Sequence, residues 1–375
     1  MSKDKTKQRK PLKVFNVKNF LAILLCILIG GSGCLLLAGY NTLESVNFKP
    51  LDSEIEKATK PDGQKIENPY TTAKEDANLS LTNGKLLDDP NILNIMLFGE
   101  DKAGKGETYG RSDTMIMLSI DNINKSLKLT SFMRDLYVDI PGYGEHKLNS
   151  AYSWGGASLS IQTIESNFGI NVDRYAIVDF NSFKSIIDVL GGVDIKLTQE
   201  EIDYINWQMY RNHQTDTQTD LVAEAGVVHL NGTQALWYAR NRGDSEAGFS
   251  GDDWDRTERQ RNLLGVLVEK MKGASITQIV DIVGKVGPMI TTNLKKNEIT
   301  FLVTNALTYL NYDFKEISVP TQSCWEYSET VDGLSIIVIT DWDKQRFELA
   351  YYIYEDKLIK ANPEYASYVE ETTVA

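Results

Sequence analysis

Cysteine and histidine are scarce in this chain of 375 residues, with three of each. Cys26 and Cys34 fall in an apolar N-terminal segment, which leaves only Cys324 in the rest of the chain. A single cysteine forms no intrachain disulfide, so the body must be stabilised by its hydrophobic core. The histidines do not show the spacing of zinc ligands, which argues against a zinc site: they are His146, His213 and His229.

Basic residues are in the minority beyond the first 18 positions. The chain has a net charge of −13, and residues 1–18 hold seven basic residues against one aspartate, a net +6. The remainder therefore carries −19. Because duplex nucleic acid is bound by basic surfaces, this acidic body argues against a nucleic-acid partner and against a transcriptional regulator. The sequence also lacks a G-x-S-x-G elbow and a P-loop, which argues against a serine hydrolase and a nucleotide-driven motor.

Residues 19–43 contain no charged side chain and are almost entirely apolar. A segment of this length can cross the ~30 Å hydrocarbon layer of a membrane. The basic residues precede it and Glu44 follows it, so the positive-inside rule predicts a cytoplasmic tail over 1–18 and an extracytoplasmic body. A cleaved signal peptide is the alternative, although the apolar run exceeds an h-region of about 7–15 residues. We predict a single-pass protein of the cell membrane, anchored in lipid by residues 19–43.

Residues 44–90 are polar and rich in lysine, acid and proline, which is typical of an extracytoplasmic linker. From residue 91 to 375, apolar strand patterns alternate with amphipathic helix patterns. This alternation predicts an α/β domain in which helices cover both faces of a mixed central sheet. Strands are expected at 91–98, from 114, from 126, at 137–140 (in a hairpin), 174–180, 193–197, 314–319 and 334–340. Helices are expected at 158–170, 181–193, 198–210, 231–240, 256–272, 275–286, 297–310 and from 343.

Two carboxylates flank the loop between the first two predicted strands. Asp101 follows the first strand and Asp113 precedes the second, so neighbouring strands would bring both acids to one edge of the sheet. Acids at strand ends are often only turn formers. The functional alternative is a hard divalent cation, Mg²⁺ or else Mn²⁺, because such an ion takes one or two protein carboxylates together with substrate phosphates.

Five arginines crowd the stretch "WYARNRGDSEAGFSGDDWDRTERQRN" at 237–262. Arg240 and Arg242 end a half-apolar helical run, and a helix from Arg256 would place Arg259 and Gln260 on the face that also becomes apolar. Buried arginines need partners, either nearby acids or an anionic ligand. Two further candidates for binding an anion are Arg134, whose alternative partners are Asp135 and Asp139, and Lys147. For a protein outside the cell, a lipid-linked pyrophosphate is the anion that fits.

Several linked segments resemble the LytR-CpsA-Psr family of cell-wall glycopolymer ligases. The resemblance covers roughly residues 90–265, with the core motifs in 91–265. It is carried in order by "GRSDTMIMLSID", "LTSFMRDLYVDIPGYGEHKLNSAYSWGG", "VDFNSFKSIIDVLGGVDI", "HLNGTQALWYARNR" and "DWDRTERQ".

The resemblance implies an enzyme that moves a glycopolymer, of the teichoic acid or capsular polysaccharide type, from undecaprenyl diphosphate to peptidoglycan. The new bond is a phosphodiester, the acceptor is typically the 6-hydroxyl of N-acetylmuramic acid, and undecaprenyl phosphate is released. The prenyl tail would enter an apolar slot between sheet and helices. The family also implies metal binding by Asp101 and Asp113.

The same resemblance implies a pyrophosphate clamp of Arg134, Arg240, Arg242 and Arg256, with Asp253 and Gln260 beside it and Arg259 in the same motif. Asp253 is the candidate general base. The segment 243–252 is longer than usual for the family, which leaves the choice between Asp252 and Asp253 open. "DRTE" from Asp255 suggests a capped helix that starts near Arg256.

Three other functions compete with transfer. A phosphatase or pyrophosphatase would use the same groups with water as the acceptor. A non-catalytic wall-binding module would not need the acid pair together with the arginines. A transcriptional regulator would need a basic, cytoplasmic face.

Overall fold

The computed structural model describes residues 46–51, 86–101, 109–215, 221, 224–272, 284–309, 312–322, 324–330 and 332–355. The predicted tail (1–18), anchor (19–43) and most of the predicted linker (44–90) lie outside these residues. Among the residues described, no helix is both long and apolar enough to span a bilayer.

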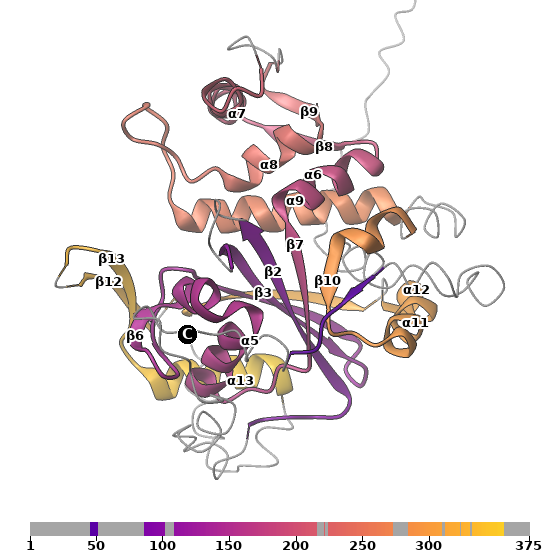
Figure 1. Ribbon diagram of the computed structural model, residues 1–375, viewed down its shortest axis with the longest axis vertical. Helices are drawn as coiled ribbons and strands as arrows, with labels where there is room; N and C mark the ends of the chain where they lie inside the picture. The colour runs from indigo at the N-terminus through magenta and orange to yellow at the C-terminus, as the bar shows by residue number, and fades with distance from the viewer. Residues whose placement is uncertain are drawn as a thin grey trace, which may run out of the picture.

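A seven-stranded sheet forms the centre of the molecule (Figure 1). Its β7–β2, β4–β11 and β1–β10 pairs are parallel and its other pairs are antiparallel, so the predicted mixed sheet is confirmed. The strands lie in the order β1 (Asn47–Phe48), β10 (Ile290–Thr292), β7 (Arg174–Asp179), β2 (Ile92–Asp101), β3 (Arg111–Asp121), β4 (Ser126–Phe132) and β11 (Asp313–Val319).

Helices cover both faces of this sheet, as predicted. Successive side chains of a strand point to opposite faces, so Ile95 and Leu97 belong to one buried cluster and Met96 and Phe98 to the other. The first cluster includes residues of α6 (Phe180–Val189), α8 (Gly232–Arg240) and α9 (Asp253–Lys272). The second includes residues of α5 (Leu148–Phe168) and α13 (Trp342–Tyr354). Figure 1 shows these groups of helices on opposite sides of the sheet.

Three two-stranded sheets and several shorter elements complete the described fold. The predicted hairpin at "YVDI" and "PGYG" is present as β5 and β6. The elements are β5 (Tyr137–Ile140) with β6 (Gly144–Lys147), β8 (Val193–Leu197) with β9 (Gly226–Leu230), β12 (Trp325–Glu329) with β13 (Ser335–Ile339), α7 (Gln199–Arg211), η3 (Gly287–Met289), α11 (Lys296–Thr304) and α12 (Ala306–Tyr309).

Some predicted boundaries were wrong, for identifiable reasons. Helix α5 has two parts, separated by the non-helical dihedral angles of Gly155 and Gly156. The part after these glycines matches the predicted helix from 158, and the part that begins at Leu148 was not predicted. The predicted helix 297–310 is divided into α11 and α12. Strands β9, β10 and β12 were not predicted, since each is short and only partly apolar. Most of the predicted helix 275–286 lies outside the described residues.

Candidate active site

A β-bulge aims Asp113 at the candidate site. In the β2–β3 pair, Thr114 lies opposite Gly99 and Ser112 lies opposite Glu100, so Asp113 is the extra residue. Bulges of this kind bend a strand and redirect a side chain. As a result, Asp113 and Thr114, although consecutive, both line the same cavity on the α6–α8–α9 face of the sheet.

The two predicted acids lie at one edge of the sheet, and each contacts an arginine. Asp101, the last residue of β2, accepts a hydrogen bond from Arg240 Nη2 at 3.2 Å. Asp113 Oδ1 accepts one from Arg134 Nη1 at 2.9 Å. The second oxygens, Asp101 Oδ1 and Asp113 Oδ2, accept no hydrogen bond from the described residues.

Asp253 joins Arg134 to Arg256. Arg256 Nη2 lies 2.9 Å from the carboxylate of Asp253, and Arg134 Nε lies 3.3 Å from its Oδ1. Arg256 Nη1 is also 3.8 Å from Asp113 Oδ1, so two arginines and two aspartates form one network. Asp135 adds a contact of 3.4 Å to Arg134 Nε. The side chain of Arg256 is only 4% exposed, and the residue would be costly to bury without these partners.

The two aspartates of the network have opposite pKa shifts. Burial alone would raise the pKa of Asp113, but attraction from Arg256 and Arg134 outweighs it and lowers that pKa below its usual value. Burial raises the pKa of Asp253, and the attraction of the same two arginines offsets this only in part. Asp113 is thus held ionised, whereas Asp253 is the network carboxylate more ready to accept a proton.

The register of Asp252 and Asp253 is set by the start of α9. Asp255 N donates to Asp252 Oδ1 and Asp252 N donates to Asp255 Oδ2, each at 3.0 Å, so Asp252 and Asp255 form a reciprocal cap. The prediction that the helix starts near Arg256 was wrong, because the cap lies three residues earlier than "DRTE" suggested. Asp252 therefore satisfies backbone groups, and Asp253 is the acid in the arginine network.

The long segment before α9 packs against α7. Phe249 contacts Tyr204 and Trp207 with ring centroids 5.4 and 5.5 Å apart. At the ends of the loop, a Cβ on Gly243 would come within 2.6 Å of Ser250 backbone, so only glycine permits this close approach. The loop thereby brings the end of α8 and the start of α9 together, and Arg242 and Asp253 with them.

Replacement of Asp252 by alanine is expected to destabilise the protein by about 1 kcal/mol, the usual effect of removing a helix cap. Asp252→Asn keeps an acceptor and should retain most of this stability. Thermal melts of both variants provide the measurement. If Asp252→Ala instead leaves the melting temperature unchanged and abolishes turnover, the assignment of Asp252 to the cap is wrong.

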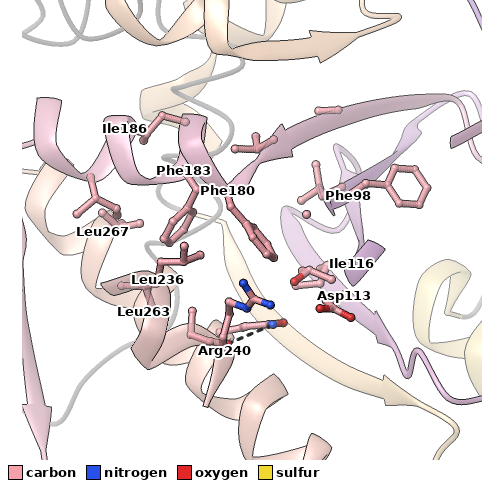
Figure 2. A pocket seen from close by; sticks show the side chains of 18 of the residues that line it. Phe98, Asp113, Ile116, Phe180, Phe183, Ile186, Leu236, Arg240, Leu263 and Leu267 are labelled. Atoms are coloured by element: carbon pink, nitrogen blue, oxygen red, sulfur yellow. Dashed lines mark hydrogen bonds between the residues drawn. The ribbon is translucent and has the colours of Figure 1, made fainter. Parts of the chain in front are cut away.

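A cavity of about 130 Å³ opens beside the network, between the sheet and helices α6, α8 and α9 (Figure 2). Most of its walls are apolar, while Asp113, Arg240, Arg256 and Gln260 contribute polar groups. In Figure 2, Arg240 and Asp113 lie together, away from Ile186 and Leu267. The cavity is thus an apolar slot with a charged end. Its apolar lining includes Leu97, Ile116, Val178, Phe180, Phe183, Ile186, Leu236, Leu263 and Leu267.

Arg240 is placed by the end of α8 and by aromatic contacts. Its guanidinium carbon lies 4.4 Å from the ring centroid of Phe180 and 5.2 Å from that of Trp237. These cation–π contacts hold a side chain that is still 30% exposed. Arg240 therefore remains accessible to an anion at the charged end of the slot.

The remaining predicted residues fall in three places. Gln260 lines the slot and donates to Ala239 O at 3.4 Å, whereas Arg259 does not line it. Arg259 contacts Glu201 at 2.8 Å and Asn241 O at 3.0 Å, and so joins α9 to α7 and to the end of α8. Arg242 and Lys147 line a second pocket, where Lys147 pairs with Asp135 at 2.8 Å.

This second pocket, called the open pocket below, lies on the other side of the arginine network. It has a volume of about 410 Å³ and is lined by polar and basic residues. Arg134 belongs to the open pocket, while Asp113 and Arg256 belong to the slot, so the network separates the two. The other lining residues are Arg111, Asp135, Lys147, Asn149, Ser150, Ser153, Trp154, Arg242 and Leu334.

The sequence did not identify the residues of the slot. Phe180, Phe183, Ile186 and Ile187 of α6 recur with helical spacing and face the cavity. That periodicity indicates a buried face, but an apolar helix face that packs on a sheet has the same spacing. The hollow itself depends on the distance between α6 and α9, which no local pattern encodes.

Asp101 and Asp113 are also the pair best suited to a metal. Each carboxylate accepts a hydrogen bond from an arginine through one oxygen, and the other oxygen accepts none from the described residues. Within the described chain, no group of three or more histidine, cysteine or acidic residues could hold an ion. A cation here would need further ligands from water or substrate, which is how Mg²⁺ is commonly bound.

The chain is similar to several known proteins. "Regulatory protein MsrR" of Staphylococcus aureus is 32% identical over 273 residues, which is 72% of this chain and 77% of that protein. "Polyisoprenyl-teichoic acid--peptidoglycan teichoic acid transferase TagU" of Oceanobacillus iheyensis is 28% identical, covering 92% of this chain and 96% of its own.

The fold matches that of Bacillus subtilis TagT (YwtF), solved with bound octaprenyl pyrophosphate lipid. The TM-score is 0.52 at 21% identity, over 74% of this chain and 99% of TagT. The LytR_cpsA_psr family matches residues 54–348. This match takes in the strands from β2 onward, the helices from α5 to α12 and every charged residue of the network, and the chain therefore belongs to the LytR_cpsA_psr family.

Proposed function

We propose that this protein is a phosphotransferase that attaches a glycopolymer to peptidoglycan through a phosphodiester. The donor would be the polymer linked to undecaprenyl diphosphate, of the teichoic acid or capsular polysaccharide type, and undecaprenyl phosphate would be released. One observation carries this proposal: an apolar slot ends at a cluster of arginines and aspartates. A prenyl diphosphate has the matching chemistry, an apolar chain joined to a strongly anionic head.

The relatives support the same assignment. TagU is named as a transferase of teichoic acid from a polyisoprenyl carrier to peptidoglycan, and TagT was solved with a prenyl pyrophosphate. MsrR, in contrast, is named as a regulatory protein. The body of this chain carries −19, which disfavours direct binding to DNA.

The network would act mainly through charge. Phosphoryl transfer depends on positioning and on neutralising the charge that develops on the leaving group. Arg134, Arg240 and Arg256 would hold the diphosphate, with planar forks suited to phosphate oxygens. Asp253, whose pKa is raised by burial, would accept the proton of the acceptor hydroxyl. The partly positive N-terminus of α9, which begins at Asp253, adds to the attraction.

A divalent cation, Mg²⁺ or Mn²⁺, would be held by Asp101 and Asp113. When bound, it would neutralise diphosphate charge alongside the arginines. If the purified protein is fully active in excess chelator, the reaction does not need a metal and this part of the proposal fails.

The proposed location is the outer face of the cell membrane. The uncharged segment 19–43 after a tail of net +6 would anchor the chain with its body outside. This location also places the slot near its lipid-linked substrate. Protease added to intact protoplasts should then remove everything after about Glu44, and survival of the body would contradict the orientation.

The experiment that tests the function has two arms. Mass spectrometry of lipid that copurifies with membrane-extracted protein should find a polyprenyl phosphate or diphosphate. Incubation with a prenyl-diphosphate glycan and peptidoglycan should then give a phosphodiester-linked product. Release of free phosphorylated glycan without any linked product would favour the competing phosphatase. If neither lipid binding nor turnover occurs, the proposal fails.

The slot predicts a dependence on prenyl chain length. Ile186 is 5% exposed and lies with Leu267 away from the charged end (Figure 2). Ile186→Trp should fill this part, so we expect binding of a long prenyl diphosphate to weaken by at least about 10-fold, an energy of ~1.4 kcal/mol. A chain of two or three isoprene units should bind nearly as before.

Ile186→Val serves as the matched control, since it leaves the slot open at a usual cost of about 0.5–1.5 kcal/mol in stability. Calorimetric titration with both lipids measures the effect. Equal weakening for short and long chains would show that the tail does not occupy this slot.

A further inference from the structure

Three aromatic side chains pack together near the start of α9, and the mechanism proposed above assigns them no role. Trp254 of α9 and Trp325 of β12 have ring centroids 5.1 Å apart, and those of Trp325 and Tyr327 are 4.9 Å apart. Trp254 Nε1 donates to the hydroxyl of Tyr327 at 3.0 Å. Tyr327 is 58% exposed, and both tryptophans are partly exposed. We call these three residues the aromatic platform.

The β12–β13 hairpin, which carries Trp325 and Tyr327 of the platform, is fixed next to the active site. Ile337 N donates to Asp135 O at 3.0 Å, directly after Arg134, and Leu136 forms a bridge with Ile337. The turn of the hairpin also supplies Leu334 to the wall of the open pocket. The platform is therefore tied to the chain segment that holds Arg134. Strand β13 of the hairpin also contacts β5, which pairs with β6.

The geometry of the network indicates which reactant approaches from this side. In an in-line transfer, the attacking oxygen lies opposite the leaving group. The leaving prenyl phosphate would occupy the slot, lined by Asp113 and Arg256, whereas Arg134 faces the open pocket. Asp253 contacts both arginines and precedes Trp254 in the chain. The proposed base is thus the residue before Trp254 of the platform, in the first turn of α9.

We propose that the aromatic platform binds a sugar of the acceptor, a peptidoglycan glycan strand, next to Asp253. Sugar rings present C–H groups on their faces, and these pack against exposed aromatic rings. The open pocket alongside also carries Arg111, Lys147 and Arg242, suited to the carboxylates that peptidoglycan bears. This inference rests on the proposed function and adds the site of the second substrate to it.

Tyr327→Ala is the main test, because an exposed ring can be removed without disturbing the core. We expect the KM for a soluble peptidoglycan oligosaccharide to rise about 10-fold, the scale of one lost aromatic contact. The KM for the prenyl-diphosphate glycan, kcat at saturating acceptor and prenyl-diphosphate binding should stay at wild-type values. Tyr327→Phe keeps the ring and loses only the hydrogen bond from Trp254, so it should retain most of the affinity.

The control is Tyr210→Ala, which removes another exposed tyrosine, 44% exposed on α7. It should change neither KM. Fluorescence titration of wild type and Tyr327→Ala with the oligosaccharide alone measures the contact without turnover, and it should show the same loss.

The possible outcomes separate the inference from the function on which it rests. If wild type turns over and Tyr327→Ala keeps the wild-type acceptor KM, the platform is structural and the inference is overturned. A rise in the KM for the prenyl-diphosphate glycan would assign the platform to the donor polymer, and this result would also overturn the inference. Failure of the wild type to bind any prenyl diphosphate would count against the proposed function instead.

Discussion

Asp253→Asn is expected to lower the rate of transfer at neutral pH by about 10²–10⁴-fold, the usual contribution of a general base. The amide retains the shape of the side chain but cannot accept the proton of the attacking hydroxyl. Binding of the prenyl diphosphate should be unchanged or tighter, because Arg134 and Arg256 lose an acidic competitor while the substrate brings its own negative charge. Single-turnover rates and lipid titrations measure the two effects separately.

The pH dependence follows from the raised pKa of Asp253. The base works as a carboxylate, so turnover should fall as the pH drops through this pKa. That fall should occur at a higher pH than for an ordinary aspartate of pKa 3.8. The residual activity of Asp253→Asn should not show this fall at low pH. Asp252→Asn, which changes the neighbouring helix cap, should keep the wild-type profile.

A variant Asp253→Asn with nearly full activity would show that another group accepts the proton. A variant that loses prenyl-diphosphate binding as well would show that Asp253 mainly orders the arginines. Neither outcome would overturn the assignment of the apolar slot to the prenyl chain.

The sequence predicted the architecture better than it predicted the contacts. Strand and helix patterns gave the α/β sheet with helices on both faces, because period-2 and period-3.6 patterns follow directly from backbone geometry. Asp101 and Asp113 were expected at one edge of the sheet, and they are there. The bulge that turns Asp113 toward the slot is a register shift between two strands, and neither strand encodes it alone.

The arginine-rich stretch shows the same limit. Helical spacing predicted that Arg256, Arg259 and Gln260 share a face, but Arg259 turns to Glu201 on α7, an acid 58 positions away in the chain. The sequence left open whether acids or a ligand would neutralise the arginines. In the structure, aspartates pair with Arg134, Arg240 and Arg256. The pairs Arg134–Asp113, Arg134–Asp253 and Arg240–Asp101 are long-range, so they depend on the tertiary fold rather than on local pattern. Only Arg134–Asp135 and Arg256–Asp253 are local among the pairs described here.

Arg240→Ala and Arg256→Ala are expected to have different effects, because the two arginines differ in burial. Arg240 is 30% exposed and its partner Asp101 is 32% exposed, so loss of this pair should cost less than about 1 kcal/mol of stability. Arg256 is 4% exposed, and its loss would leave Asp253 and Asp113 with less compensation. Breaking a buried pair in this way typically costs about 3–5 kcal/mol, which should lower the melting temperature by on the order of 10 °C.

Binding should fall in both variants. A charge-assisted hydrogen bond contributes about 1.5–3 kcal/mol, so each alanine should weaken prenyl-diphosphate binding roughly 10–100-fold. Arg240→Lys keeps the charge but loses the planar fork, and it should restore part of the affinity. Arg256→Lys keeps a charge near the buried acids and should recover part of the lost stability.

Arg211→Ala is the control for these variants, since Arg211 is 63% exposed and stacks on Trp207 outside both pockets. This substitution should shift the melting temperature by at most about two degrees, and it should leave the affinity for the prenyl diphosphate unchanged. Thermal melts and lipid titrations on the five variants separate stability from binding. If Arg240→Ala binds the prenyl diphosphate as tightly as wild type, the charged end of the slot is not where the diphosphate lies. The cluster would then be a structural ion-pair network that closes one end of an apolar cavity.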